Sequence, residues 1–171
     1  MTTQTEAIGS TTRLLRSLAS QQDRVLGILA GLDEEALRRP VLTSGWSCLG
    51  MVQHLTGMTR FWFVEVMAGR PVDDPVGDSF VVPVGRSSGE VLAAYRTTIE
   101  QADLAVERLP LLTTAPAWWP DGLFGDWRLD TLEEVLLHVL AETACHCGHL
   151  DAARELIDGR TWDWEHGRLA D

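Results

Sequence analysis

Hydrophobic residues recur along the chain at intervals of three, four and seven positions, the spacing of amphipathic helices. Four segments have this pattern and predict helices at about residues 5–32, 47–68, 88–109 and 131–158. No segment alternates apolar and polar residues for long enough to indicate a buried strand. Four long helices without a sheet predict an all-α fold, a four-helix bundle, followed by a polar tail at residues 160–171.

Residues that begin and end helices agree with these boundaries. Ser47 is suited to cap the second helix, and the pairs Ser87 with Glu90 and Asp130 with Glu133 have the spacing of capping boxes. Gly159 suits the left-handed position after the last helix. The acidic run that begins at residue 33 predicts a turn between the first two helices.

Long connections separate the second, third and fourth helices. They exceed what a simple helical hairpin needs, so we expect at least one crossover connection. The loop at residues 110–129 carries four large aromatic side chains. They suit either a hydrophobic lid over the end of the bundle or the wall of a ligand pocket.

Length and charge limit the possible partners. The 171 residues correspond to one domain, residues 1–171, and 45% of them are hydrophobic, as in a folded soluble protein. The formal net charge of −11 argues against nucleic acid and against anionic membrane surfaces. No apolar run is long enough to cross a membrane, and three cysteines do not make a disulfide framework, so we expect a reducing, cytoplasmic location.

The fourth helix carries the residues most suited to chemistry. His138, Glu142 and His146 follow one another at intervals of four and form a column on its inward side, with His149 one turn beyond His146. Glu142 and His146 are spaced to bind one divalent ion, and His54 on the second helix is the candidate third ligand. Two ligands on one helix and one on another leave a coordination position open, as in catalytic sites.

Simpler interpretations of these residues stay open. Glu142 with His146 is also the spacing of an ion pair, and His54 also suits a hydrogen-bonded core histidine. Cys145 and Cys147 lie about 200° apart around a helix, which excludes both from one zinc site. Glu65, near the end of the second helix, is expected to be solvated, with a buried carboxylate as the alternative.

Two stretches resemble the DinB-like (YfiT-like) metalloenzyme superfamily, in particular its branch with mycothiol-dependent maleylpyruvate isomerase. They are Trp46-Ser47 with Gln53-His54-Leu55, and the run from Leu136 to Gly159 around Glu142 and His146. The resemblance implies a four-helix bundle with a crossover, commonly a homodimer, that holds one zinc or nickel ion. It implies His54, Glu142 and His146 as the metal ligands. His149 is then expected to contact a ligand or to act as an acid or base near the pocket, His138 to contact a ligand, and the alternative for both is simple packing.

The resemblance also implies a function. Enzymes of the superfamily bind a low-molecular-weight thiol such as mycothiol at the metal, and the thiolate then attacks a small electrophile. We therefore expect a thiol transferase or isomerase whose partners are a small thiol and a small electrophile. The alternative is a helical bundle that binds a metal or a hydrophobic ligand without catalysis.

Overall fold

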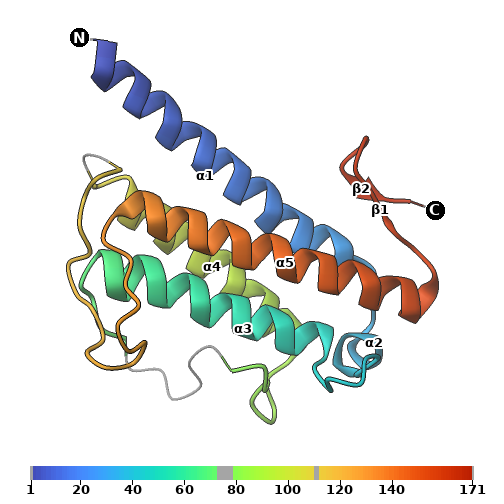
Figure 1. Ribbon diagram of the computed structural model, residues 1–171. Helices are drawn as coiled ribbons and strands as arrows, with labels where there is room; N and C mark the ends of the chain where they lie inside the picture. Colours follow the sequence, from blue (N-terminus) through green and yellow to red (C-terminus); the bar gives the residue numbers. More distant parts are fainter. Residues whose placement is uncertain (1, 73–78, 110–111, 171) are drawn as a thin grey trace.

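Four long helices make up most of the computed structural model, which describes residues 2–72, 79–109 and 112–170 (Figure 1). They are α1 (Thr2–Leu29), α3 (Cys48–Arg60) with its continuation η1 (Phe61–Met67), α4 (Ser88–Val106) and α5 (Leu132–Asp158). The predicted all-α bundle is confirmed. Within the described part of the chain, no helix is both long and apolar enough to span a membrane.

The helices run as two parallel pairs. α1 lies along α5 in the same direction, since Gln21, Arg24 and Ile28 contact Cys147, Asp151 and Arg154 in that order. α3 and α4 also run in the same direction, both starting near the short helix α2 (Glu34–Arg38) (Figure 1). A chain that leaves the end of α3 must therefore return along the whole bundle before α4 begins. This return is the expected crossover connection.

The core lies between the four helices and consists mainly of apolar side chains, with Arg154 as its largest fully buried polar residue. Its largest fully buried apolar side chains are Tyr95, Phe63, Ile28, Leu49, Met51, Leu55, Met67, Leu132, Leu136 and Leu150. Burying a side chain of this size stabilises the fold by about 1.5–3 kcal/mol. These contacts hold α3 and α5 side by side, which is what the site depends on.

The helix caps follow the predicted residues with one exception. Ser47 accepts a hydrogen bond from the backbone of Gly50, and Ser87 forms a capping box with Glu90. At α5 the box consists of Thr131 and Glu134, not Asp130 and Glu133. Both pairs have the right spacing, and the structure uses the later one, which begins α5 at the buried Leu132.

Three local elements differ from the prediction. Residues 47–68 do not form one α-helix, because α3 ends at Arg60 and η1 continues as a π-helix. The predicted acidic turn contains α2, which Asp33 caps by accepting a hydrogen bond from Ala36. The predicted polar tail contains the antiparallel strands β1 (Trp162–Asp163) and β2 (Arg168–Leu169).

The C-terminal hairpin is fastened to α1 and α5. Asp151 forms an ion pair with Arg24 at 2.5 Å and also accepts a hydrogen bond from the backbone N–H of Trp162. The Arg24 guanidinium lies 3.6 Å from the ring centre of Trp164. The hairpin thus closes over the α1–α5 pair, on the far side of α5 from α3 (Figure 1).

Candidate metal centre

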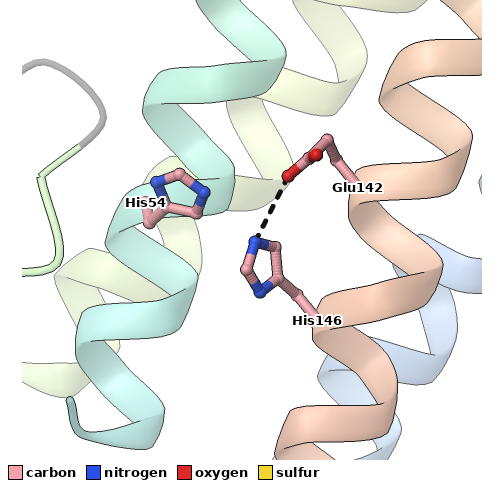
Figure 2. Close-up of side chains that lie close together, drawn as sticks. All are labelled: His54, Glu142 and His146. Atoms are coloured by element: carbon pink, nitrogen blue, oxygen red, sulfur yellow. Dashed lines mark ion pairs between the residues drawn. The ribbon is translucent and has the colours of Figure 1, made fainter. Parts of the chain in front are cut away.

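Three side chains from two helices converge between α3 and α5 (Figure 2). His54 comes from α3, while Glu142 and His146 come from successive turns of α5. Each residue offers one ligand atom, and these atoms all lie within 4.8 Å of one another. All three residues are half-buried. The structure therefore brings together the three residues that the sequence predicts as ligands.

Aromatic contacts fix the orientation of His54. Its ring is stacked on Phe80 with ring centres 4.1 Å apart and an angle of 11°, and it meets the ring of His146 edge-on at 4.9 Å. Phe80 reaches this position because the chain passes very close to Gly50. A Cβ atom at residue 50 would lie 2.2 Å from the carbonyl oxygen of Phe80. The glycine thus lets the loop approach α3 closely enough to support His54.

The surroundings of His146 favour its neutral form. Burial and the neighbouring His54 lower its pKa, against the opposing influence of Glu142. Its Nε2 atom lies 3.5 Å from a carboxylate oxygen of Glu142, and its Nδ1 atom lies 3.2 Å from Nδ1 of His149. One ring of that pair of histidines must donate and the other accept. The contact with His149 orients the His146 ring so that its Nε2 atom faces Glu142. The lowered pKa matters because the neutral imidazole is the form that binds metals.

The donor set fits a divalent transition metal. A tetrahedral ion with bonds of about 2.0–2.2 Å requires donor atoms about 3.3–3.6 Å apart. The atoms of Glu142 and His146 already meet this requirement at 3.5 Å. Two imidazole nitrogens and one carboxylate oxygen suit zinc or nickel and leave a fourth position for another ligand.

The other histidines lie outside this cluster. His138 packs its ring against Trp62 and Trp127, with ring centres 4.8 and 5.4 Å away, and burial lowers its pKa. His149 is exposed beside His146 and Trp46. His166 pairs with Asp163 in the hairpin at 2.8 Å. His149 thus contacts the candidate ligand His146 directly, whereas His138 is not part of the cluster of candidate ligands.

The two neighbouring cysteines point in different directions, as their helical spacing predicts. Cys147 is buried, and its thiol donates to the backbone oxygen of Gln21 on α1. Burial raises the pKa of the Cys147 thiol to about 12. Cys145 is exposed. Neither belongs to the group of candidate ligands.

A pocket of about 410 Å³ opens beside the cluster, and His54 and Glu142 form part of its wall. Its volume lies in the range of small-molecule sites. Phe61, Trp62 and Phe124 supply aromatic surface, and His138 also faces it. Leu123 and Phe124 of the aromatic loop line it, so part of this loop forms a pocket wall. Trp119 and Trp127 of the same loop instead pack on Trp62, as the interpretation of a hydrophobic lid expects.

Two residues of the pocket are not among the predicted site residues. Arg60 and Glu65 form an ion pair at 3.3 Å, with only 13% and 15% of their side chains exposed. Glu65 is therefore not solvated, and the alternative of a buried carboxylate holds. The two are five residues apart, a spacing that does not align side chains on an α-helix but does on a π-helix. The sequence gives no signal for the ion pair between Arg60 and Glu65, because it does not reveal the π-helical conformation of η1.

Comparison with known protein families identifies a matching family. The model of the family described as mycothiol-S-transferase matches residues 13–159. No curated protein and no solved structure matches the chain.

Proposed function

Because the chain belongs to the mycothiol-S-transferase family, we propose that it is a metal-dependent enzyme that transfers a mycothiol-type thiol to a small electrophile. The family is part of the DinB-like metalloenzyme superfamily, so the resemblance noted in the sequence is confirmed. The observation that carries the proposal is the convergence of His54, Glu142 and His146 on the edge of an aromatic pocket.

In this proposal the three residues hold one zinc or nickel ion. Such an ion, when bound, lowers the pKa of a coordinated thiol so that a thiolate is available at neutral pH. Glu142 contributes one negative charge, which leaves a net charge of +1 at the centre and favours an anionic fourth ligand. His149 orients His146 through the contact between their Nδ1 atoms.

The pocket places the second substrate next to the thiol. Transfer forms a bond between the thiol sulfur and an electrophilic carbon, while the thiol proton passes to solvent. Where that carbon carries a leaving group, the group departs with its bonding electron pair. Where the carbon belongs to a conjugated double bond, the displaced π electron pair takes up a proton from solvent. An isomerase would release the thiol again from the same carbon, so thiol consumption separates the two reactions.

The first experiment is elemental analysis of the purified protein beside a His54→Ala, His146→Ala double variant. We expect about one divalent ion per chain, lost in the double variant and retained in a His166→Ala control. Absence of metal from the wild type after incubation with zinc and with nickel would overturn the proposal.

Catalysis is tested on the same metal-loaded protein. Consumption of a small thiol in the presence of an electrophile should depend on the metal and disappear in the double variant. Bound metal without any thiol consumption would instead favour a ligand-binding bundle. We also infer that the protein is a homodimer and that it is cytoplasmic. A mass in solution of twice that of one chain, measured by sedimentation, would support the dimer.

A further inference from the structure

His138 is a polar side chain of the pocket wall that the candidate metal centre does not use. Its ring lies between Trp62 and Trp127, with ring centres 4.8 and 5.4 Å away, and the residue is half-buried. No residue in the described part of the chain forms a hydrogen bond with its ring nitrogens. Packing thus holds the ring in place, and a ligand in the pocket can supply its polar partner.

The surroundings of His138 favour its neutral form, which carries one N–H donor. Burial lowers the pKa of His138, and this effect outweighs the charge of Glu142, which would raise the pKa. A neutral imidazole donates from one nitrogen and accepts at the other. A ligand that covers this donor without accepting from it loses binding free energy, because the N–H is then left without water and without a partner.

His138 precedes Glu142 by one turn of α5, so the two side chains share a face of the helix. Glu142 points from this face toward α3 (Figure 2). Four residues of an α-helix rise about 6 Å. Under the proposed function, the thiol and the carbon that it attacks lie at the Glu142 end of this column. A ligand oxygen that reaches His138 must therefore lie several bonds away from the attacked carbon.

Aromatic rings of the pocket wall favour a planar ligand. The rings of Trp62 and Phe124 are nearly parallel, at 18°, with centres 5.7 Å apart. Phe61 stands edge-on to both, at 5.1 and 6.1 Å. Such faces and edges favour another planar π system in stacked or edge-to-face contact. In a planar conjugated carbonyl compound, the oxygen and the electrophilic carbon lie at opposite ends of the conjugated system, as the column of His138 and Glu142 requires.

We propose that His138 contacts the electrophile and donates a hydrogen bond to its carbonyl oxygen, so that the pocket takes planar α,β-unsaturated carbonyl compounds. The thiolate sulfur forms a bond to the β-carbon, and the π electron pair moves through the conjugated system to the oxygen. The His138 N–H stabilises the negative charge on that oxygen and keeps its proton. The α-carbon then takes up a proton from solvent. The inference rests on the proposed function for the attacking thiol and for the position of attack.

Binding of unreactive ligands tests this hydrogen bond without metal or thiol. The ketone 2-acetylnaphthalene and the alkene 2-isopropenylnaphthalene have the same shape and differ in an oxygen atom replaced by a CH₂ group. Isothermal titration calorimetry on the metal-free full chain gives the ratio of their affinities. His138→Phe keeps a ring between Trp62 and Trp127 but removes the N–H, and should shift the ratio against the ketone by about three- to tenfold. His166→Phe, in the hairpin, should leave the ratio unchanged. An unchanged ratio in His138→Phe, or no binding of the ketone to the wild type, would overturn the proposal.

The vibrational spectrum of the bound ketone gives a readout that packing alone does not change. A hydrogen bond to the oxygen lowers the C=O stretching frequency below its value in an apolar solvent. Infrared difference spectra with an isotope-labelled carbonyl should show this lowering in the wild-type complex and lose it in His138→Phe. A frequency in the wild-type complex equal to that in hexane would refute the hydrogen bond, and this result does not depend on the folding of any variant.

Activity of the zinc-loaded protein tests the catalytic role of His138. With mycothiol as the thiol, His138→Phe should lower kcat for 4-phenyl-3-buten-2-one by about tenfold or more, because the N–H stabilises charge that develops during the reaction. Displacement of chloride from benzyl chloride puts no charge on a carbonyl oxygen, so its kcat should change less than about twofold. Equal losses for the two substrates would contradict this role. A protein that binds the ketone through His138 but consumes no thiol would refute the proposed function alone.

Discussion

The three candidate ligands differ in how firmly their neighbours hold them. His54 is stacked on Phe80, and His146 contacts both His149 and Glu142. Glu142 has 41% of its side chain exposed, and its contact with His146 is 3.5 Å long. The two imidazoles are therefore preorganised, and Glu142 is the ligand with freedom to adjust when an ion binds.

Replacement of single histidines tests the ligand assignment. His54→Ala should lower metal affinity by about a hundredfold or more, because it removes one of three ligands. His138→Ala should change it less than about threefold, since His138 packs on Trp62 and Trp127 outside the cluster. Competition with a metal chelator measures the metal dissociation constant of each variant. Equal losses in the two variants would contradict the assignment.

Arg154 and Asp158 form an ion pair whose contribution to the stability of the fold depends on pH. Arg154 is 2% exposed and donates to the carbonyl oxygens of Ile28 and Ala30 as well as to Asp158. Partial burial alone would raise the pKa of Asp158, but the hydrogen bonds from Arg154 and from the backbone of Arg160 outweigh it. The pKa therefore lies below its ordinary value.

A carboxyl group with a lowered pKa stabilises the fold when it is ionised. Asp158→Asn should therefore lower the free energy of unfolding by about 0.5–1 kcal/mol at neutral pH. The expected loss is small because solvent screens the charge of this partly exposed side chain. The difference should persist above the pKa of the unfolded state and vanish as pH falls through the lower pKa of the folded state. Urea titrations at several pH values measure it. A difference that grows in acid would refute this account.

At the scale of elements, the approach of the loop around Phe80 to α3 depends on Gly50. Gly50→Ala should destabilise the protein by about 1–3 kcal/mol, because the new Cβ atom meets a backbone oxygen that cannot move alone. It should also weaken metal binding, since Phe80 would no longer support His54. Thermal unfolding and chelator competition measure the two effects.

Gly148 provides the matched control for this substitution. It lies within α5, and no atom approaches the position of its Cβ within 4 Å. Gly148→Ala should therefore stabilise the protein by about 0.5–1 kcal/mol through helix propensity alone. Destabilisation by both substitutions would show that steric contact at Gly50 is not the cause.

Sequence patterns predict helices well but not every departure from the α-helix. The spacing of apolar residues and the residues Ser47, Ser87 and Gly159 indicate where helices begin and end. They do not reveal that residues 61–67 adopt a π-helix, because one extra residue in a turn leaves the apolar pattern almost unchanged. The sequence predicts a solvated Glu65 near the end of the helix, with a buried carboxylate as the alternative, whereas in the structure Glu65 lies in the pocket wall and pairs with Arg60.

The candidate ligands on the helices could be predicted from the sequence, whereas the loop residues around them could not. Glu142 and His146 are local partners on one helix, and a histidine at position 54 lies on the helix that must face them. Phe80 and Phe124 belong to connections whose course depends on tertiary packing, so no periodic pattern assigns them to the site. The hairpin in the tail was missed because each of its strands has only two residues.

For the whole molecule, a bound ion should act as a cross-link between α3 and α5. Because the unfolded chain does not assemble the three ligands, metal at about one hundred times its dissociation constant should stabilise the fold by about 2.7 kcal/mol. For a chain of this size that corresponds to a rise in Tm of about 5–10 °C. Calorimetry before and after treatment with a chelator measures the shift. The same shift in the His54→Ala, His146→Ala variant would contradict a site at this position.

The pairing of α1 with α5, the first and last long helices, has a consequence for the order of events during synthesis. A nascent chain can associate α3 with α4 early, but α1 lacks its parallel neighbour until α5 has left the ribosome. Domains form as units, with N-terminal parts emerging first. His54 emerges well before Glu142 and His146, so a translating ribosome exposes one ligand alone for much of the elongation time. Under the proposed function, metal capture is therefore expected to follow translation and to require the completed bundle.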